Sequence, residues 1–178
     1  PDSEGNVHAA FSGPPDAAFD VSIGMASKLY IHDAPEEVDI LVVGAGGRPY
    51  DSTLIKACNA VFNAEEAVSE DGRVVIVAQC EEGPGESGFY NFLSRFKDPK
   101  AALGEVRKDF TLEAYKAMRL LRLREGHGIS LVSAMPLHFA EKMHLRTADT
   151  ANEGLQNACR FLGRESRIGV VVDGSSVA

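Results

Sequence analysis

Apolar and polar positions along this chain follow two alternating patterns. Short runs that are apolar almost throughout predict strands, because a strand buried on both faces of a parallel sheet has no polar side. These runs cover residues 6–11, 38–43, 73–79, 129–134 and 167–174. Longer segments with apolar residues three or four apart predict helices. They cover residues 14–30, 51–68, 85–96, 99–108, 111–126, 136–143 and 152–163.

The order of these segments predicts the fold class. Strands that alternate with helices pair in parallel, and each helix forms a right-handed crossover. The pattern therefore predicts a doubly wound α/β fold, with a mostly parallel sheet of about five strands and helices on both faces. No clear boundary interrupts it, so residues 1–178 are expected to form a single α/β domain.

Ligands of doubly wound sheets bind beyond the carboxyl ends of the strands, so function is expected there. In this chain those ends are GAGGRPYD at 44–51, QCEEGPGESGFY at 79–90 and SAMPLH at 133–138. The second of them contains Gly83, Gly85 and Gly88, which cost backbone entropy without a packing return. They indicate either a backbone that approaches a ligand or another surface, or an ordinary long loop.

The first glycine loop does not match a nucleotide-binding motif. Gly44 and Gly46 supply two glycines of the fingerprint G-x-G-x-x-G, but Pro49 occupies the third position. The phosphate loop G-x-x-x-x-G-K-S/T is also absent, so a nucleotide-binding oxidoreductase domain is disfavoured. Two interpretations remain open. The loop is a structural turn at Gly46 and Gly47, or it helps to bind an anion or a substrate. In the second case the anion would lie at the start of the following helix, which Asp51 is expected to cap.

Charge and composition narrow the range of partners. The chain has 178 residues, with 26 Asp and Glu against 18 Lys and Arg, and its formal net charge of −8 disfavours nucleic acid. No apolar run approaches the roughly 20 residues that span a bilayer, and the first residues do not form a signal peptide. They read PDSEGN without an initiator Met, which indicates a processed chain or an excised fragment. We expect a cytoplasmic protein that does not bind membranes.

Metal-ligating and nucleophilic residues form no recognisable constellation. Three widely spaced cysteines indicate neither a disulfide framework nor a metal site. Cys58 and Cys159 are expected to be buried free thiols, which fits a reducing cytoplasm. The histidines, which have no metal-ligand spacing, are His8, His32, His127, His138 and His144. No catalytic residue and no metal site are therefore expected in this chain.

The two glycine loops, in this order and at this spacing, resemble a known family. A strand ends in the motif GG-x-P-x-D, here GGRPYD, and a helix of small and polar residues follows. The motif A-E-x-x-V-x-x-x-G then precedes the next strand, and a loop G-x-G-x-x-G-F-Y, here GPGESGFY, follows that strand. With PDAAFDVSIGMASKLY, these motifs resemble the C-terminal domain of the nickel-dependent lactate racemase family. The resemblance is close over residues 5–95 and extends in outline over the rest.

The resemblance implies a larger enzyme of two domains. In the family, an N-terminal domain binds a covalently attached nickel pincer nucleotide through a Lys and a metal-ligating His. It also carries two catalytic histidines, and the C-terminal domain closes the cleft. The implied reaction is racemisation or epimerisation of a small 2-hydroxy acid by hydride abstraction and return. This chain would be the C-terminal domain alone, inactive by itself, with its own N-terminal domain as its partner.

The resemblance also implies substrate-binding residues on the helix after GGRPYD. The family has a Gln there and, three residues later, a Lys that project into the cleft. This sequence has Lys56 and Asn59 at the matching positions. Residues three apart share one helix face, which Ser52 and Asn63 extend. The face is either plainly solvated or it lines the cleft, where Lys56 would attract a carboxylate or a phosphate.

Residues of the first loop are further candidates for substrate binding. Gly46 and Gly47 form its flexible turn, and Arg48 beside them is a candidate contact for an anion, with an ordinary surface role as the alternative. Tyr50 is expected to pack against the loop.

Two functions from different classes remain. The first is the cleft-closing C-terminal domain of a 2-hydroxy acid racemase or epimerase. Because Lys56 and Asn59 depart from the family pattern, its substrate would be a hydroxy acid other than lactate. The alternative is a non-catalytic α/β module that binds an acidic metabolite or has a regulatory role.

Overall fold

A computed structural model describes residues 6–31, 36–163 and 165–177, and His32 lies outside these ranges. The strands are β1 (Val38–Gly44), β2 (Val68–Val77), β3 (Gly128–Val132), β4 (Arg146–Thr147) and β5 (Ile168–Val171). The helices are α1 (Pro15–Tyr30), α2 (Leu54–Ala64), α3 (Ser87–Arg95), α4 (Pro99–Lys108), α5 (Leu112–Gly126), α6 (Leu137–Lys142) and α7 (Ala151–Leu162). Two 3-10 turns, η1 (Glu65–Ala67) and η2 (Gly174–Ser176), complete the described elements.

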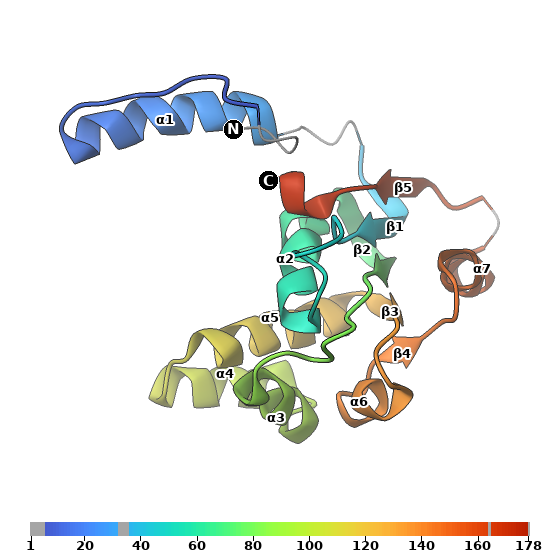
Figure 1. Cartoon of the computed structure of the whole chain (residues 1–178). Coiled ribbons are helices and arrows are strands. Elements are labelled where there is room, and N and C mark those ends of the chain that lie inside the picture. The colour runs from blue at the N-terminus through green and yellow to red at the C-terminus, as the bar shows by residue number, and fades with distance from the viewer. Residues whose placement is uncertain (1–5, 32–35, 164, 178) are drawn as a thin grey trace.

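The five strands form one sheet in the order β4-β3-β2-β1-β5, and every neighbouring pair is parallel. Helices α2 and α7 lie on opposite sides of this sheet (Figure 1). Helix α5 shares the core with α2, and α3 and α4 pack against α5. The prediction of a doubly wound α/β fold with about five parallel strands is therefore confirmed.

Strand β1 is buried on both faces, which explains why its sequence has no polar side. Leu41 and Val43 belong to the main core cluster with residues of α2 and α5. The alternate residues Ile40 and Val42 are also buried, on the side that α7 covers. Gly154 lets α7 approach closely, since a Cβ there would lie 2.8 Å from a Val75 methyl. Both faces of the central strands are thus covered, as the continuous apolar runs require.

One predicted strand is absent from the structure and one observed strand was not predicted, although the number of strands agrees. Residues 6–11 do not form a strand, and all of them are exposed. Val7 is 74% exposed, so this segment has no buried face that would hold it in a sheet. The fifth strand is instead β4, which the apolar pattern missed because its two residues are polar and exposed. β4 is defined only by pairing with β3, where Ser130 lies opposite Arg146.

Helix α1 stands apart from the sheet and its helices (Figure 1). It was predicted at almost the same boundaries, yet none of its residues is buried. In the part of the chain that the structure describes, no helix is long and apolar enough to cross a membrane.

Candidate functional site

The candidate site lies at the carboxyl edge of the sheet, where the loops after β1 and β2 are joined by hydrogen bonds. The backbone N–H of Cys80 donates to the carbonyl of Asp51 at 2.7 Å, and the N–H of Glu82 donates to Ser52 at 2.9 Å. Asp51 Oδ2 accepts a bond from the N–H of Gln79 at 3.1 Å. Asp51, only 8% exposed, therefore holds the two loops together.

The role predicted for Asp51 as a helix cap is wrong, because α2 begins three residues later. Its N-cap is Thr53, whose side chain makes no capping bond. The second glycine loop caps the helix instead, since the N–H groups of Leu54 and Ile55 donate to the carbonyls of Gly83 and Pro84 at 3.0 and 3.2 Å. These N–H groups are therefore already satisfied, and they do not form the anion site considered from the sequence.

Gly85 explains why this second loop is rich in glycine. Its φ is +95°, and a Cβ at this position would lie 2.5 Å from the Cγ2 methyl of Ile55. The backbone thus approaches the first turn of α2 more closely than a side chain would allow. Of the alternatives left open by the sequence, the close approach to another surface is the one that the structure shows.

Lys56, Asn59 and Asn63 lie along the exposed side of α2, whereas most of its other residues are buried. The predicted polar face is thus confirmed for these three residues, although Ser52 before the helix is buried. Lys56 Nζ donates to Ser52 Oγ at 2.9 Å. Asn63 Nδ2 donates to the carbonyl of Gly174 at 3.1 Å, which fastens η2 to α2.

The two candidate cations at this edge differ in how their charge is balanced. Arg48 forms an ion pair with Glu81 and lies 3.8 Å from a carboxylate oxygen of Glu82, so its charge is compensated. Among the described residues, no carboxylate lies within ion-pair distance of Lys56. Lys56 is therefore better placed than Arg48 to attract an anion. Tyr50 is 54% exposed rather than packed against the loop as predicted.

Gly46 and Gly47 have φ values of +88° and +74°, which favour glycine, but their surroundings differ. A Cβ at Gly47 would meet no atom within 4 Å, whereas one at Gly46 would clash with Asp173 Oδ1 and Ser175 Oγ. Gly46 is therefore a contact between the loop after β1 and the end of the chain after β5.

Asp173 is a residue of this edge that the sequence analysis missed. It accepts bonds from Ser175 Oγ and Ser176 Oγ, both at 2.6 Å, and from the backbone N–H of Ser175. These bonds hold the pKa of the Asp173 carboxyl below its usual value. An Asp followed two residues later by Ser is a recognisable turn signal, and the segment DGSS, which begins two residues after the end of β5, contains it.

The loop after β3 joins the same edge through aromatic contacts. The rings of Tyr90 and Phe139 meet edge to face, with centroids 5.5 Å apart. A Cβ on Gly83 would lie 3.8 Å from the Phe139 ring. The exposed His138 precedes this ring on α6. The three predicted strand ends therefore meet along one edge, as parallel pairing requires.

Cysteine and histidine positions bear on metal binding. Within the described ranges no three His, Cys, Asp or Glu residues are grouped so that they could hold a metal ion. Burial raises the pKa of the Cys58 and Cys80 thiols to about 12. Cys159 is partly exposed rather than buried as predicted. Burial also lowers the pKa of His127.

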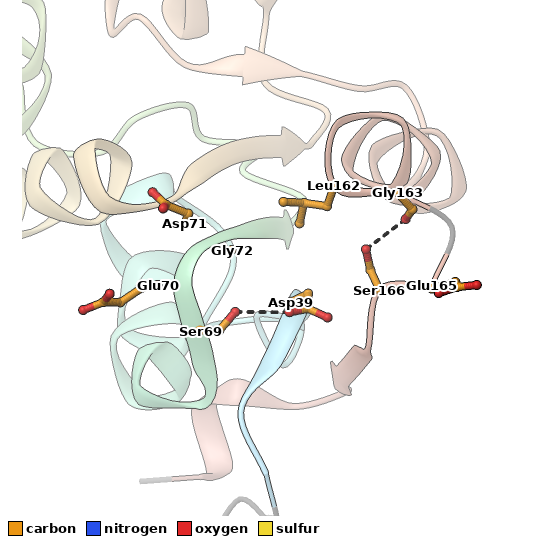
Figure 2. A pocket seen from close by; sticks show the side chains of 9 residues that line it. All are labelled: Asp39, Ser69, Glu70, Asp71, Gly72, Leu162, Gly163, Glu165 and Ser166. Atoms are coloured by element: carbon orange, nitrogen blue, oxygen red, sulfur yellow. Dashed lines mark hydrogen bonds between the residues drawn. The ribbon is translucent and has the colours of Figure 1, made fainter.

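Two cavities lie away from this edge. One, of about 510 Å³, is at the amino ends of β1 and β2 and contains Asp39, Asp71 and Glu165 (Figure 2). Its carboxylates would repel an anionic substrate. The other, of about 550 Å³, lies between the sheet, α6 and α7 and contains Arg73 and Arg146. The Arg73 guanidinium stacks on the Phe161 ring at 3.6 Å from its centroid. Neither cavity is lined by the loops after β1 and β2.

Comparisons with known proteins agree on one family. The family model for the lactate racemase C-terminal domain matches residues 34–178. Curated lactate racemases from Thermoanaerobacterium thermosaccharolyticum and Lactiplantibacillus plantarum are each 26% identical to this chain over 181 residues. These alignments cover 99% of this chain but 42% of each relative, so the chain spans less than half of their length.

Solved structures give the same result for the fold. The lactate racemase apoprotein from Thermoanaerobacterium thermosaccharolyticum superposes with a TM-score of 0.91 and 25% identity. The superposition covers 99% of this chain and 43% of that protein. A Thermotoga maritima protein shares the fold at a TM-score of 0.61 and 12% identity, over 89% of this chain and 40% of its own.

Proposed function

Because the chain belongs to the lactate racemase C-terminal domain family, we propose that it is the cleft-closing domain of a 2-hydroxy acid racemase or epimerase. Its parent protein would carry an N-terminal domain that holds a nickel pincer nucleotide and the catalytic histidines. The observation that carries the proposal is Lys56, an exposed cation at the carboxyl edge without a carboxylate partner among the described residues. The free thiols fit a cytoplasmic location.

Lys56 would bind the carboxylate of the substrate, and Asn59 would contribute a neutral amide. The two residues lie three apart on α2, so they share its exposed face. In the family pattern the Lys occupies the position of Asn59, and here the positive charge is about one helical turn, roughly 5 Å, nearer the start of the helix. That shift would displace the carboxylate, and it supports a substrate other than lactate.

The described residues of this chain do not form a nickel site, so the nickel pincer nucleotide would be held by the domain outside it. When bound there, it would supply the acceptor for hydride transfer. The contribution of this chain would be to bind and orient the substrate and to exclude water from the closed cleft. The attraction between the Lys56 ammonium group and the substrate carboxylate would become stronger as water leaves the cleft, because charges interact more strongly in a less polar medium.

Substitution of Lys56 tests the substrate-binding role in the full-length parent protein. We expect Lys56→Ala to lower kcat/KM at least tenfold, about 1.4 kcal/mol of transition-state stabilisation. Lys100→Ala on α4 is the matched control, since Lys100 is also exposed but lies on another helix. The pair Lys56→Gln and Asn59→Lys restores the family pattern and is expected to shift the preference towards lactate. Unchanged kinetics for Lys56→Ala would remove Lys56 from the site.

Nickel content separates the enzyme from its main alternative. The parent protein would be co-expressed with the enzymes that make the cofactor and then analysed by elemental mass spectrometry. About one nickel per chain would support the racemase assignment. A folded protein without nickel, in cells that demonstrably make the cofactor, would contradict it. The domain would then be a non-catalytic module, and Lys56 would serve to bind an acidic metabolite.

A further inference from the structure

Helix α1 exposes apolar side chains that no described residue of this chain buries. Phe19 and Ile23 are 66% and 47% exposed, and they lie four residues apart, on one side of the helix. Ala26 continues this side by one turn and is also exposed. We call these three residues the α1 apolar face. No residue of α1 is buried, and the helix stands apart from the sheet (Figure 1).

Such a helix requires a partner. Most of the stability of protein helices comes from packing an apolar face against another part of the protein rather than from helix propensity. The residues of α2 show the contrast, since eight of its eleven are buried. Exposed apolar faces on an otherwise well-packed protein mark interaction surfaces. The α1 apolar face therefore indicates contact with another body.

The comparisons indicate where that body lies. The C-terminal domain model matches from residue 34, and α1 ends at Tyr30, before the matched region. The alignments to the lactate racemases nevertheless cover 99% of the chain, so α1 has a counterpart in the relatives. In this chain the region matched by the C-terminal domain model begins only after α1.

The superposition on the lactate racemase apoprotein indicates where the counterpart of α1 lies relative to its sheet. Almost a fifth of the chain precedes residue 34, so a TM-score of 0.91 over 99% of the chain requires most of that region to superpose. The counterpart of α1 therefore stands off its sheet in the same way. This chain covers only 43% of the apoprotein, whose remaining residues are available to cover the helix.

We propose that the α1 apolar face docks onto the N-terminal part of the parent polypeptide, in an apolar groove. The structural boundary of the C-terminal domain then lies between Tyr30 and Val38, and α1 belongs with the preceding domain. The inference shares with the proposed function only the N-terminal part of the parent polypeptide, and it does not depend on the reaction, because it rests on the exposure of α1 and on the greater length of the relatives.

Hydrogen–deuterium exchange of the full-length parent protein tests this docking. We expect the α1 amides to be protected in the unmodified protein, because a docked helix opens rarely. The double variant Phe19→Ser with Ile23→Ser should lower their protection at least tenfold, whereas Phe19→Leu should retain it. Phe110→Ser is the matched control, because Phe110 is 67% exposed and lies outside α1. It should leave exchange in α1 unchanged.

Three outcomes would overturn the proposal. Unprotected α1 amides in the unmodified protein would show that the face is not covered. Protection that falls on dilution, together with a doubled mass in sedimentation, would assign the face to a second copy of the chain. Loss of α1 protection in Val170→Ser would show that α1 folds back on the exposed face of β5, where Val170 is 64% exposed. Nickel measured on the same samples reports separately on the racemase function.

Discussion

The contact between Gly46 and the end of the chain yields a prediction about the stability of the candidate site. Gly46→Ala forces a non-glycine residue to a φ of +88°, which costs about 1–2 kcal/mol. The new methyl group would also clash with Asp173 Oδ1 and Ser175 Oγ. These atoms cannot move freely, because Ser175 donates to Asp173 through both its hydroxyl and its backbone N–H.

The magnitude follows from these bonds. Displacing the two side chains breaks both hydrogen bonds, at about 1 kcal/mol net each. Gly46→Ala is therefore expected to lower the free energy of unfolding by about 3–4 kcal/mol. Gly47→Ala is the matched control, with a φ of +74° and open space around it. It should cost only the backbone strain, about 1–2 kcal/mol.

Urea unfolding of the single and double variants measures the difference. With Asp173→Ala as the background, Ser175 is free to rotate away, and Gly46→Ala should cost about 1–2 kcal/mol. The double-mutant cycle should then give a coupling energy of about 2 kcal/mol between positions 46 and 173. Equal costs for Gly46→Ala and Gly47→Ala, or a coupling energy near zero, would refute the contact as the reason for glycine at position 46.

Two further predictions concern titratable groups. Cys58 and Cys80 are buried with pKa values of about 12, so in the native protein at pH 8 they should resist iodoacetamide, while the partly exposed Cys159 is labelled first. Peptide mapping after timed labelling checks the order, and early labelling of Cys58 would contradict it. The pKa of Asp173 is lowered in the folded protein, so the ionised carboxylate stabilises the fold. This stabilisation is complete at neutral pH. It is lost as the pH falls from the usual carboxyl pKa, about 3.9, towards the lower pKa of the folded state. Asp173→Asn should therefore lose less stability between pH 7 and pH 3 than the unmodified chain, as measured by urea unfolding at each pH, and identical losses would contradict the assignment.

Much of the fold could be predicted because it is encoded in consecutive residues. The apolar run at 38–43 predicted β1, since a strand buried on both faces needs apolar residues throughout. The exposed face with Lys56 and Asn59 followed from helical periodicity. β4 escaped prediction because two polar residues carry no pattern, and its existence depends on pairing with β3.

The candidate site could be predicted only in part. That it lies at the carboxyl edge followed from the order of strands and helices. The hydrogen bond that Asp51 accepts from the second loop did not, because Asp51 and Gln79 are far apart in the sequence. Nor did the ion pair of Arg48 with Glu81, whereas Lys56 at the same edge has no carboxylate partner among the described residues.

The sequence by itself determined the α/β class, the covered faces of the central strands and the positions of the glycine loops, because these depend on hydrophobic periodicity and backbone freedom within short segments. Only the tertiary structure decided what those loops do. It showed that the backbone at Gly85 packs closely against the first turn of α2, and that the absence of a side chain at Gly46 lets Asp173 lie next to it. It also showed that α1 leaves its apolar face uncovered. Each of these depends on distances between segments that the sheet register sets, and no local pattern records them.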